Sequence, residues 1–247
     1  MIEIKDVKKS FGSKPVLNGI NLTINDGETH AIIGRSGCGK SVLLKHIVGL
    51  LMPDEGKIIV EGETITKCTT RRLYEIRRKF GFLFQGAALF DSLTVEGNIS
   101  LPLVENNTSF TADEIKQKVK EQLELVGLPG TEKLKPAELS GGMKKRISLA
   151  RSLITNPKYI LYDEPTTGLD PIMSDSIDDL IFNLSKKLNV TSIVVTHDMF
   201  SVQNVADKIS MINDGKIYFS GTPSDLMNSE DKVITSFIKR TGFTVEN

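Results

Sequence analysis

The sequence has few cysteines, no excess of either charge and no long apolar run. Its 247 residues include two cysteines, Cys38 and Cys68, which are too few for a disulfide framework, so we expect a reducing cytosol. Lys+Arg and Asp+Glu both number 31, which argues against a nucleic-acid partner because such proteins usually carry a basic excess. The chain has no run of about 18 apolar residues and no signal-peptide pattern at its start. We therefore expect it to work at a membrane only through a partner.

Apolar patterns along the chain predict an α/β fold. Three segments alternate apolar and polar residues and read as half-buried strands, namely 2–7, 20–24 and 57–62. Four short apolar runs read as buried strands: 29–34, 159–165, 192–198 and 208–213. A predicted helix at about 171–188 lies between the second and the third of them. Buried runs that alternate with helices indicate a parallel sheet with covered faces. Together they predict this core and an antiparallel sheet near the N-terminus.

The remaining segments are predicted to be mainly helical. Residues 41–51 have helical spacing, a basic helix leads into a strand at 80–85, and a helical insertion fills about 86–158. Within the insertion, Thr111 precedes an acidic turn and an amphipathic run, which predicts a capped helix. We expect residues 1–221 to form the main domain. Residues 222–247 should form a helical tail with one apolar side, which packs on its own domain or on a second copy.

The segment "GRSGCGKS" at 34–41 has the spacing of a phosphate loop, between a predicted strand and a predicted helix. Glycines let backbone N–H groups surround phosphate oxygens, and the start of the helix attracts the same anion. Lys40 is the expected cation for the β- and γ-phosphates, and the Ser41 hydroxyl is placed for Mg²⁺. The residues expected at the nucleotide are Gly34, Arg35, Ser36, Gly37, Cys38, Gly39, Lys40 and Ser41.

Polar residues follow two other buried strands. "YILYDEP" ends in Asp163 and Glu164, which strand alternation points in different directions. Asp163 suits an Mg²⁺ site, and Glu164 suits a general base for the attacking water. His197 ends the run "SIVVTH", and the carboxyl ends of parallel strands share one crevice. We therefore expect His197 to contact the γ-phosphate.

A second stretch, "LSGGMKKR" at 139–146, also has features of an anion site. Ser140 can cap a helix, and Gly141 and Gly142 allow close backbone approach. On its own this pattern also fits an ordinary capped helix.

Taken in order, the phosphate loop, Gln85, "LSGGM", "ILYDEP", "GLD" and His197 resemble the ATP-binding-cassette (ABC) ATPases over about residues 1–221. The resemblance implies a RecA-like P-loop NTPase core, an antiparallel β subdomain, an inserted α-helical subdomain, and ATP with Mg²⁺ as ligands. It also implies a head-to-tail dimer in which Ser140, Gly141 and Gly142 of one copy grip the γ-phosphate bound by the other. Asp170 would lie at the same seam.

The resemblance assigns further roles by position. Gln85 matches the Q loop, which contacts Mg²⁺ or its water and links the core to the helical subdomain. Phe11 matches the aromatic residue that stacks on adenine, although a lone Phe also fits a core position. The stretch "LSGGM" at 139–143 matches the signature sequence of the family, which usually ends in glutamine. Met143 stands in place of that glutamine and offers no amide donor. Alternatives are a non-transport cassette protein of DNA repair or translation and an ATP-binding regulator without turnover. The balanced charge and short insertion argue against the first, and Glu164 with His197 argue against the second.

The stretches "LSGGM" and "FQGAALFDSLTVEGNISLPL" (84–103) resemble more narrowly the ATPases of Mla/Mce-type lipid transporters. That resemblance implies a peripheral position on the cytoplasmic face of the inner membrane, a permease partner and an Mce-domain lipid-binding subunit. The alternative is a transporter ATPase for another substrate. Part of the 84–103 segment should fill the local core, and the exposed part should form a groove for a permease helix. Its apolar residues are Phe84, Leu89, Phe90, Leu93, Val95, Leu101 and Leu103.

Overall fold

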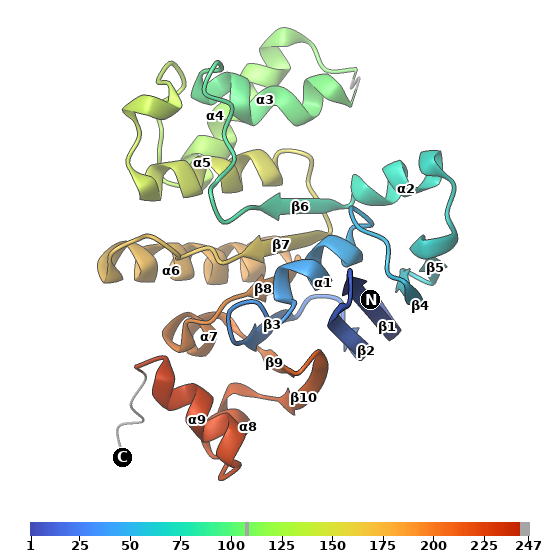
Figure 1. The fold of residues 1–247 in the computed structure, drawn as a ribbon. Helices are drawn as coiled ribbons and strands as arrows, with labels where there is room; N and C mark the ends of the chain where they lie inside the picture. The colour runs from blue at the N-terminus through green and yellow to red at the C-terminus, as the bar shows by residue number, and fades with distance from the viewer. Residues whose placement is uncertain (107–108, 243–247) are drawn as a thin grey trace.

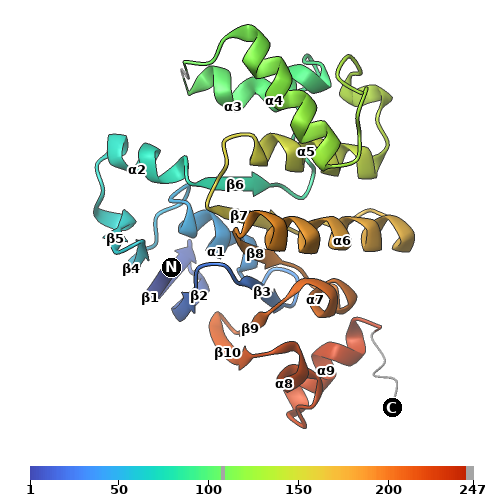
Figure 2. The same cartoon turned by 180° about the vertical axis from the view of Figure 1, so that it is seen from behind.

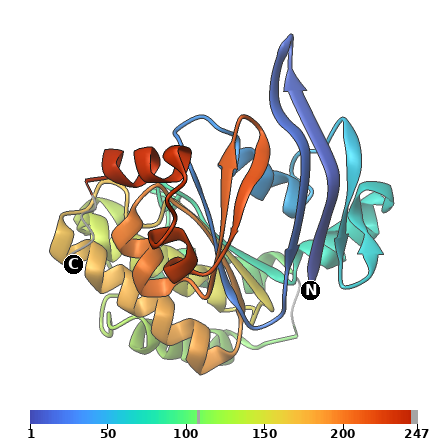
Figure 3. The same cartoon turned by 90° about the horizontal axis from the view of Figure 1, so that it is seen from below.

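The computed structural model describes residues 1–106 and 109–242, and it contains two sheets and a group of helices at one edge of the larger sheet (Figure 1). The smaller sheet is antiparallel, with the order β2-β1-β4-β5. Its first two strands form a long ribbon that extends away from the body of the protein (Figure 3). The strands are β1 (Ile2–Phe11), β2 (Lys14–Ile24), β4 (Glu55–Val60) and β5 (Glu63–Thr64).

The larger sheet has the order β10-β9-β3-β8-β7-β6. Its strands run parallel except β10, which pairs antiparallel with β9 at one edge. Because β3 lies between β8 and β9 and β8 pairs with β7, the carboxyl ends of these strands meet at one edge of the sheet. The strands are β3 (Thr29–Gly34), β6 (Phe80–Leu83), β7 (Tyr159–Asp163), β8 (Thr191–Val195), β9 (Lys208–Asn213) and β10 (Lys216–Gly221).

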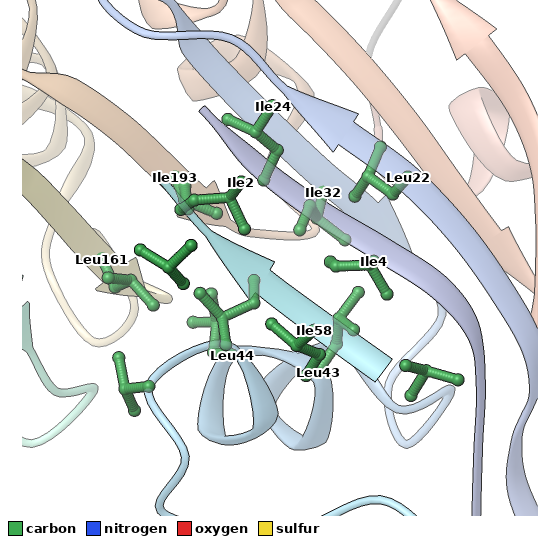
Figure 4. Packing of buried hydrophobic residues seen from close by; sticks show 14 of the residues in the cluster. Ile2, Ile4, Leu22, Ile24, Ile32, Leu43, Leu44, Ile58, Leu161 and Ile193 are labelled. Carbon is green, nitrogen blue, oxygen red and sulfur yellow. The ribbon is translucent and has the colours of Figure 1, made fainter. Parts of the chain in front are cut away.

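Helix α1 (Lys40–Ile47) lies between the two sheets and joins them into one core. Leu43 and Leu44 are fully buried, and Figure 4 shows them beside Ile4 and Ile58 of the small sheet and near Leu161 of the large sheet. Burying each such side chain stabilises the fold by about 1.5–3 kcal/mol. The helix that begins at the phosphate loop is therefore held firmly at its apolar side.

Three helices form the insertion, α3 (Val95–Glu105), α4 (Ala112–Leu125) and α5 (Gly141–Leu153), at the β6 edge of the large sheet in Figures 1 and 2. Leu149 and Leu153 of α5 pack on the large sheet. The three helices share an apolar core that includes Ile99, Leu123 and Ile147. Thr111 and Glu114 form a capping box at the start of α4, which confirms the capped helix that the sequence predicts. The connecting 3-10 turns are η1 (Ile65–Lys67) and η2 (Pro136–Glu138).

Four of the other helices pack beside the large sheet: α6 (Pro171–Leu188), α7 (Met199–Val205), α8 (Pro223–Met227) and α9 (Lys232–Arg240). Helix α2 (Thr70–Arg77) packs into the cluster that α1 forms with the small sheet. The apolar side of α9 packs into a cluster with Val202 and Met211 through Ile234, Phe237 and Ile238. The described part of the tail therefore packs on its own domain, while residues 243–247 of the predicted tail lie outside the described residues.

Several sequence predictions were wrong in detail. The helix predicted over 41–51 ends at Ile47, because Gly49 adopts a left-handed backbone (φ 66°) that closes the helix end. The two N-terminal strands are longer than predicted, β10 was not predicted, and the tail contains two helices. Among residues 1–106 and 109–242, no helix is both long and apolar enough to cross a bilayer.

Candidate active site

The phosphate loop connects the buried strand β3 to α1, as its spacing predicts. Gly34 has φ 150°, and a Cβ there would lie 2.5 Å from the carbonyl oxygen of Ile212, so no larger residue fits. The Lys40 side chain is only 6% exposed, and its ammonium donates to the carbonyls of Gly34 (2.9 Å) and Arg35 (3.3 Å). The loop thus places a buried cation at the start of a helix, where the helix dipole also favours an anion.

The two carboxylates after β7 make different contacts. Asp163 Oδ1 accepts a hydrogen bond from the Ser41 hydroxyl at 2.7 Å. Glu164 adopts a left-handed backbone (φ 50°), its Oε1 lies 3.7 Å from the Lys40 ammonium and its Oε2 lies 2.9 Å from His197 Nδ1. A left-handed residue other than glycine is strained, and such strain concentrates at functional sites. One acid therefore faces the serine and the other faces the lysine and the histidine.

His197 is exposed and lies at the carboxyl end of β8, where the sequence predicts it. Its Nδ1 contacts Glu164, whereas its Nε2 has no hydrogen-bond partner within residues 1–106 and 109–242. When Nδ1 carries the proton, the Glu164 carboxylate fixes the tautomer and leaves Nε2 as an acceptor; when both nitrogens are protonated, the ring can donate to an anion.

A cavity of about 410 Å³, which we call the phosphate cavity, lies among these groups. Eight of the residues predicted at the nucleotide line it: Arg35, Ser36, Gly37, Lys40, Ser41, Gln85, Glu164 and His197. Asp163 reaches this group through its hydrogen bond to Ser41, and Gly39 is the residue that precedes α1. The sequence thus identified most of the cavity wall, although the residues come from four distant segments.

A neighbouring cavity of about 340 Å³ shares Arg35 and Gly37 with the first and adds Cys38. The rest of its wall is the start of β2, from Lys14 to Val16, and the turn at 213–215, neither of which the sequence identified. Phe11 pairs with Lys14 across the β1–β2 hairpin and is half exposed, so it is not a core residue. Phe11 does not itself line either cavity, but it lies on the hairpin next to this wall.

The second glycine stretch begins α5, as predicted, and lies outside the phosphate cavity. Ser140 accepts from the backbone N–H of Met143 at 3.2 Å and so caps the helix. Asp170 caps α6 in the same way, by accepting from Met173 at 3.0 Å. A Cβ on Gly142 would lie 2.0 Å from Met173 Cε, so the two helix starts pack directly on each other. The Met143 side chain itself packs against the core of the insertion.

Neighbouring Gly141 is exposed at the start of α5, and a Cβ there would lie 3.3 Å from Leu169. Ser140, Gly141 and Asp170 are therefore exposed residues of one continuous surface built by the two helix starts. Gly142 lies beneath this surface, buried against Met173.

Two basic residues near the site were not identified from the sequence. Arg240 of α9 lines the phosphate cavity together with Phe237 and Thr241, and its side chain makes no hydrogen bond or ion pair with any residue that the structure describes. Lys145 of α5 is buried, whereas a lysine in a basic run is normally expected to face water. In the structure Ser148 and Ser152, which follow Lys145 at helical spacing, are also buried, but polar residues at this spacing give no sequence signal of burial.

A third cavity, of about 820 Å³, adjoins His197 and is lined by several acids, among them Asp175, Asp178 and Asp198. Asp178 is only 2% exposed, and its Oδ1 has no hydrogen-bond partner among the described residues. The pKa of this carboxyl is raised to about 7, mainly by burial and to a smaller extent by the neighbouring acids, while a hydrogen bond with Ser201 opposes the shift.

We predict that burying Asp178 lowers the free energy of unfolding by an amount that depends on pH. Because the pKa of Asp178 is higher in the folded state than its ordinary 3.8, stability is lost as the pH rises through the window from 3.8 to about 7. Above about pH 7 the ionised Asp178 lowers the free energy of unfolding by at most about 4 kcal/mol. Asp178→Asn should therefore unfold at higher urea concentration than the wild type at pH 8, with little difference at pH 4. Asp179→Asn, an exposed neighbour, is the control; equal urea midpoints for both variants at pH 8 would contradict the prediction.

A phosphate loop, an acidic pair and a histidine at the carboxyl edge of a largely parallel sheet define a nucleotide-binding P-loop ATPase core. A family model described as "ABC transporter" matches residues 17–167. The chain belongs to this family of ATP-hydrolysing transporter cassettes.

Curated relatives match almost the whole chain. The intermembrane phospholipid transport system ATP-binding protein MlaF of Haemophilus influenzae is 41% identical over 97% of this chain and 90% of its own length. MlaF of Escherichia coli K12 is 38% identical over 96% and 88%. The probable ribonucleotide transport ATP-binding protein mkl of Mycobacterium leprae is also 41% identical, over 96% of this chain and 68% of its own length.

Solved structures support the ABC ATPase fold. The cassette MJ0796, a dimer bound to ADP and Pi, aligns with a TM-score of 0.83 and 33% identity over 90% of this chain and 99% of that one. The protein cbiO1 of Clostridium perfringens, part of the transporter complex cbiONQ, aligns with a TM-score of 0.84 and 30% identity over 98% and 95%. The RecA-like core, the antiparallel subdomain and the helical insertion predicted from the sequence are thereby confirmed as the fold class.

Proposed function

We propose that this ATPase drives phospholipid movement between membranes by opening and closing a partner permease. The observation that carries the mechanism is the cavity in which Lys40, Glu164 and His197 converge on one phosphate site. The observation that supports the substrate class is the likeness to two MlaF proteins over nearly their full length. The assignments of residue roles below are part of this proposal.

The phosphate loop would bind the nucleotide. Lys40 and the backbone N–H groups of residues 34–41 would face the β- and γ-phosphates, and Phe11 with the start of β2 would hold the adenine. Ser41 and Asp163 present oxygen atoms 2.7 Å apart, the type of donor that Mg²⁺ prefers. No group of three or more metal-ligating His, Cys, Asp or Glu side chains occurs in the described chain, which fits an ion that completes its shell with phosphate oxygens and water.

Mg²⁺ bound at Ser41 and Asp163, with Gln85 nearby, would neutralise phosphate charge. Glu164 is placed to accept a proton from the attacking water, and His197, held by Glu164, would contact the γ-phosphate through Nε2. Phosphoryl transfer needs mainly positioning and charge stabilisation, which these buried or oriented groups supply.

A second copy would complete the site. Ser140 and the first turn of α5, whose leading backbone N–H groups have no partner within the helix, would form an anion site for a phosphate bound by the other copy. Asp170 lies on the same surface, next to the packed pair Gly142 and Met173. A head-to-tail dimer, of the kind in which related cassettes crystallise, would place this surface over the partner's γ-phosphate.

The 84–103 segment provides a surface for the permease. A cavity of about 420 Å³ is lined by aromatic and apolar side chains, including Phe84, Phe90 and Leu101. Phe90 is 52% exposed, whereas Val95 and Leu103 fill the core of the insertion. This division between core and exposed groove is the one that the sequence predicts. Leu89, however, packs against the insertion core, so only Phe90 is suited to a test of docking.

We predict that Phe90→Glu uncouples transport. An unpaired charge in an apolar contact is costly to bury, so binding to the permease should weaken about tenfold or more. ATP binding by the isolated chain should remain normal, because Phe90 does not line the phosphate cavity. Co-purification with the permease and nucleotide titration check both parts. Phe182→Glu, at an exposed aromatic residue of α6 outside the groove, is the control. Loss of ATP binding in the Phe90 variant would contradict the prediction.

The substrate class requires a separate test, since mkl is named for ribonucleotide transport and is equally identical to this chain. We propose phospholipid as the cargo, a position at the cytoplasmic face of the inner membrane and an Mce-domain protein as a further subunit. The experiment is to purify the intact transporter through this chain and to identify its subunits and bound small molecules by mass spectrometry. Recovery of an Mce-domain subunit and phospholipid supports the proposal; recovery of another substrate-binding subunit with nucleoside ligands contradicts it.

A further inference from the structure

Helix α5, which begins at Ser140, also holds the loop after β6. Three of its polar side chains, spaced by three residues on one side of the helix, donate hydrogen bonds to backbone carbonyls of that loop. Ser148 Oγ donates to Ala87 at 2.7 Å, Arg151 donates to Ala87 at 3.0 Å and to Ala88 at 2.8 Å, and the Lys145 ammonium donates to Gln85. We call residues 85–88 the Q loop and these three side chains the α5 clamp.

The Q loop has a strained backbone that the clamp stabilises. Ala87 and Ala88 both have positive φ angles, 60° and 49°, which are unfavourable for residues with a Cβ. Such conformations persist only where the surroundings fix them. The carbonyls of these residues accept three of the clamp's hydrogen bonds. The position of Gln85 therefore depends on α5 as well as on β6.

Lys145 also contacts the main chain of Glu164, the proposed general base. Its side chain is only 5% exposed, and its ammonium donates to the main-chain carbonyl of Glu164 at 3.4 Å as well as to Gln85. Burial lowers the pKa of Lys145, whereas the nearby Asp163 and Glu164 carboxylates raise it. A buried cation bound mainly to carbonyls is expensive for stability alone, and this cost favours a functional reason for the lysine.

The α5 clamp extends from Gln85 and Glu164 to the apolar groove that contains Phe90. Arg151 and Ala88 line the apolar groove together with Phe90, so one end of the clamp lies where the permease is proposed to bind. The other end is Lys145, which bonds the Q loop and the residue that follows β7. The clamp therefore fixes both ends of the Q loop, with Ala87 and Ala88 held at the groove by Ser148 and Arg151, and Gln85 held by the same Lys145 ammonium that donates to Glu164.

We propose that Lys145 is a positioning residue that holds the backbone of Gln85 and Glu164 in place against helix α5. The inference rests on the proposed roles of Gln85 and Glu164 and goes beyond them by naming the residue that fixes both. Lys145 acts on the reaction through these two backbone carbonyls and touches no substrate.

The test compares four substitutions in the full chain: Lys145→Met, Lys145→Gln, Lys145→Arg and Lys120→Met. Methionine keeps the length of the side chain but removes the donors, glutamine keeps an amide donor, and arginine keeps both donors and charge. Lys120 is an exposed lysine of the same insertion whose side chain makes no hydrogen bond or ion pair with the described residues. ATP turnover, nucleotide affinity, melting temperature and amide hydrogen exchange are measured for each variant.

For Lys145→Met we expect kcat to fall about tenfold or more while the KM for ATP stays within about twofold, because the phosphate loop is intact but the hydrolytic residues are misplaced. Amide exchange should rise in residues 85–88. Lys145→Arg should recover at least about half of the wild-type kcat, and Lys120→Met should match the wild type. If the methionine variant does not fold, Lys145→Gln should show the same pattern, a lower kcat with a nearly unchanged KM, but with a smaller fall in kcat.

Wild-type kcat in both Lys145→Met and Lys145→Gln would overturn the inference. A parallel rise in KM with unchanged exchange at residues 85–88 would also overturn it, since that pattern indicates general damage to nucleotide binding. Glu164→Gln is measured alongside the four variants. If Glu164→Gln retained turnover, the proposed role of Glu164 would be wrong. If Glu164→Gln were inactive while Lys145→Met was fully active, only the proposed role of Lys145 would be wrong.

Discussion

Glu164→Gln is expected to bind ATP at least as tightly as the wild type and to turn it over about a hundredfold more slowly, or slower still. The amide keeps the shape of the side chain and can still hydrogen-bond to His197, but it cannot accept the proton of the attacking water. The substitution also removes a carboxylate 3.7 Å from the Lys40 ammonium, next to the phosphate cavity. Less negative charge at that point favours binding of an anion.

Two measurements separate these effects. Fluorescent-nucleotide titration reports binding, and phosphate release reports turnover. Glu124→Gln, at an exposed glutamate of α4, controls for loss of a negative charge elsewhere. Turnover by Glu164→Gln close to the wild-type rate would remove Glu164 from the role of general base, and Asp163 would then be the next carboxylate to test.

Much of the fold and the phosphate site could be predicted because the relevant signals are local. Glycine spacing, the apolar run before Gly34 and the acids after β7 lie within single segments, and the carboxyl ends of parallel strands must meet at one edge. Helix caps such as Thr111 and Ser140 were also readable, because a cap depends on neighbouring residues alone.

What could not be predicted depends on tertiary contacts. β10 has no strong apolar pattern because it is an edge strand with alternating exposed residues, and only its pairing with β9 defines it. Lys145 appeared to belong to a solvated basic run, but carbonyls from two distant segments accept its hydrogen bonds. Arg240 reaches the phosphate cavity only because α9 packs back onto the core. Its sequence position, far from every motif, carries no such information.

Mixing two inactive variants is expected to restore activity if the site is shared between two copies. Lys40→Met removes the phosphate cation but leaves the signature intact. Ser140→Asp keeps a good helix cap, since Asp and Ser cap equally well, yet places a negative charge where the partner's γ-phosphate should bind. Each variant alone should lose about a hundredfold in turnover, because every site of its dimer is defective.

In a head-to-tail dimer of the two variants, both defects fall in one site and the other site is intact. Random mixing makes about half of the dimers mixed, so about one quarter of the wild-type sites are restored. A single-turnover assay with labelled ATP counts these sites even if steady cycling requires two. The double variant Lys40→Met/Ser140→Asp, mixed with either single variant, restores none and serves as the control. If the mixture of single variants remained as inactive as this control, the signature of one copy would not complete the phosphate site of the other, and Ser140 would act within its own chain.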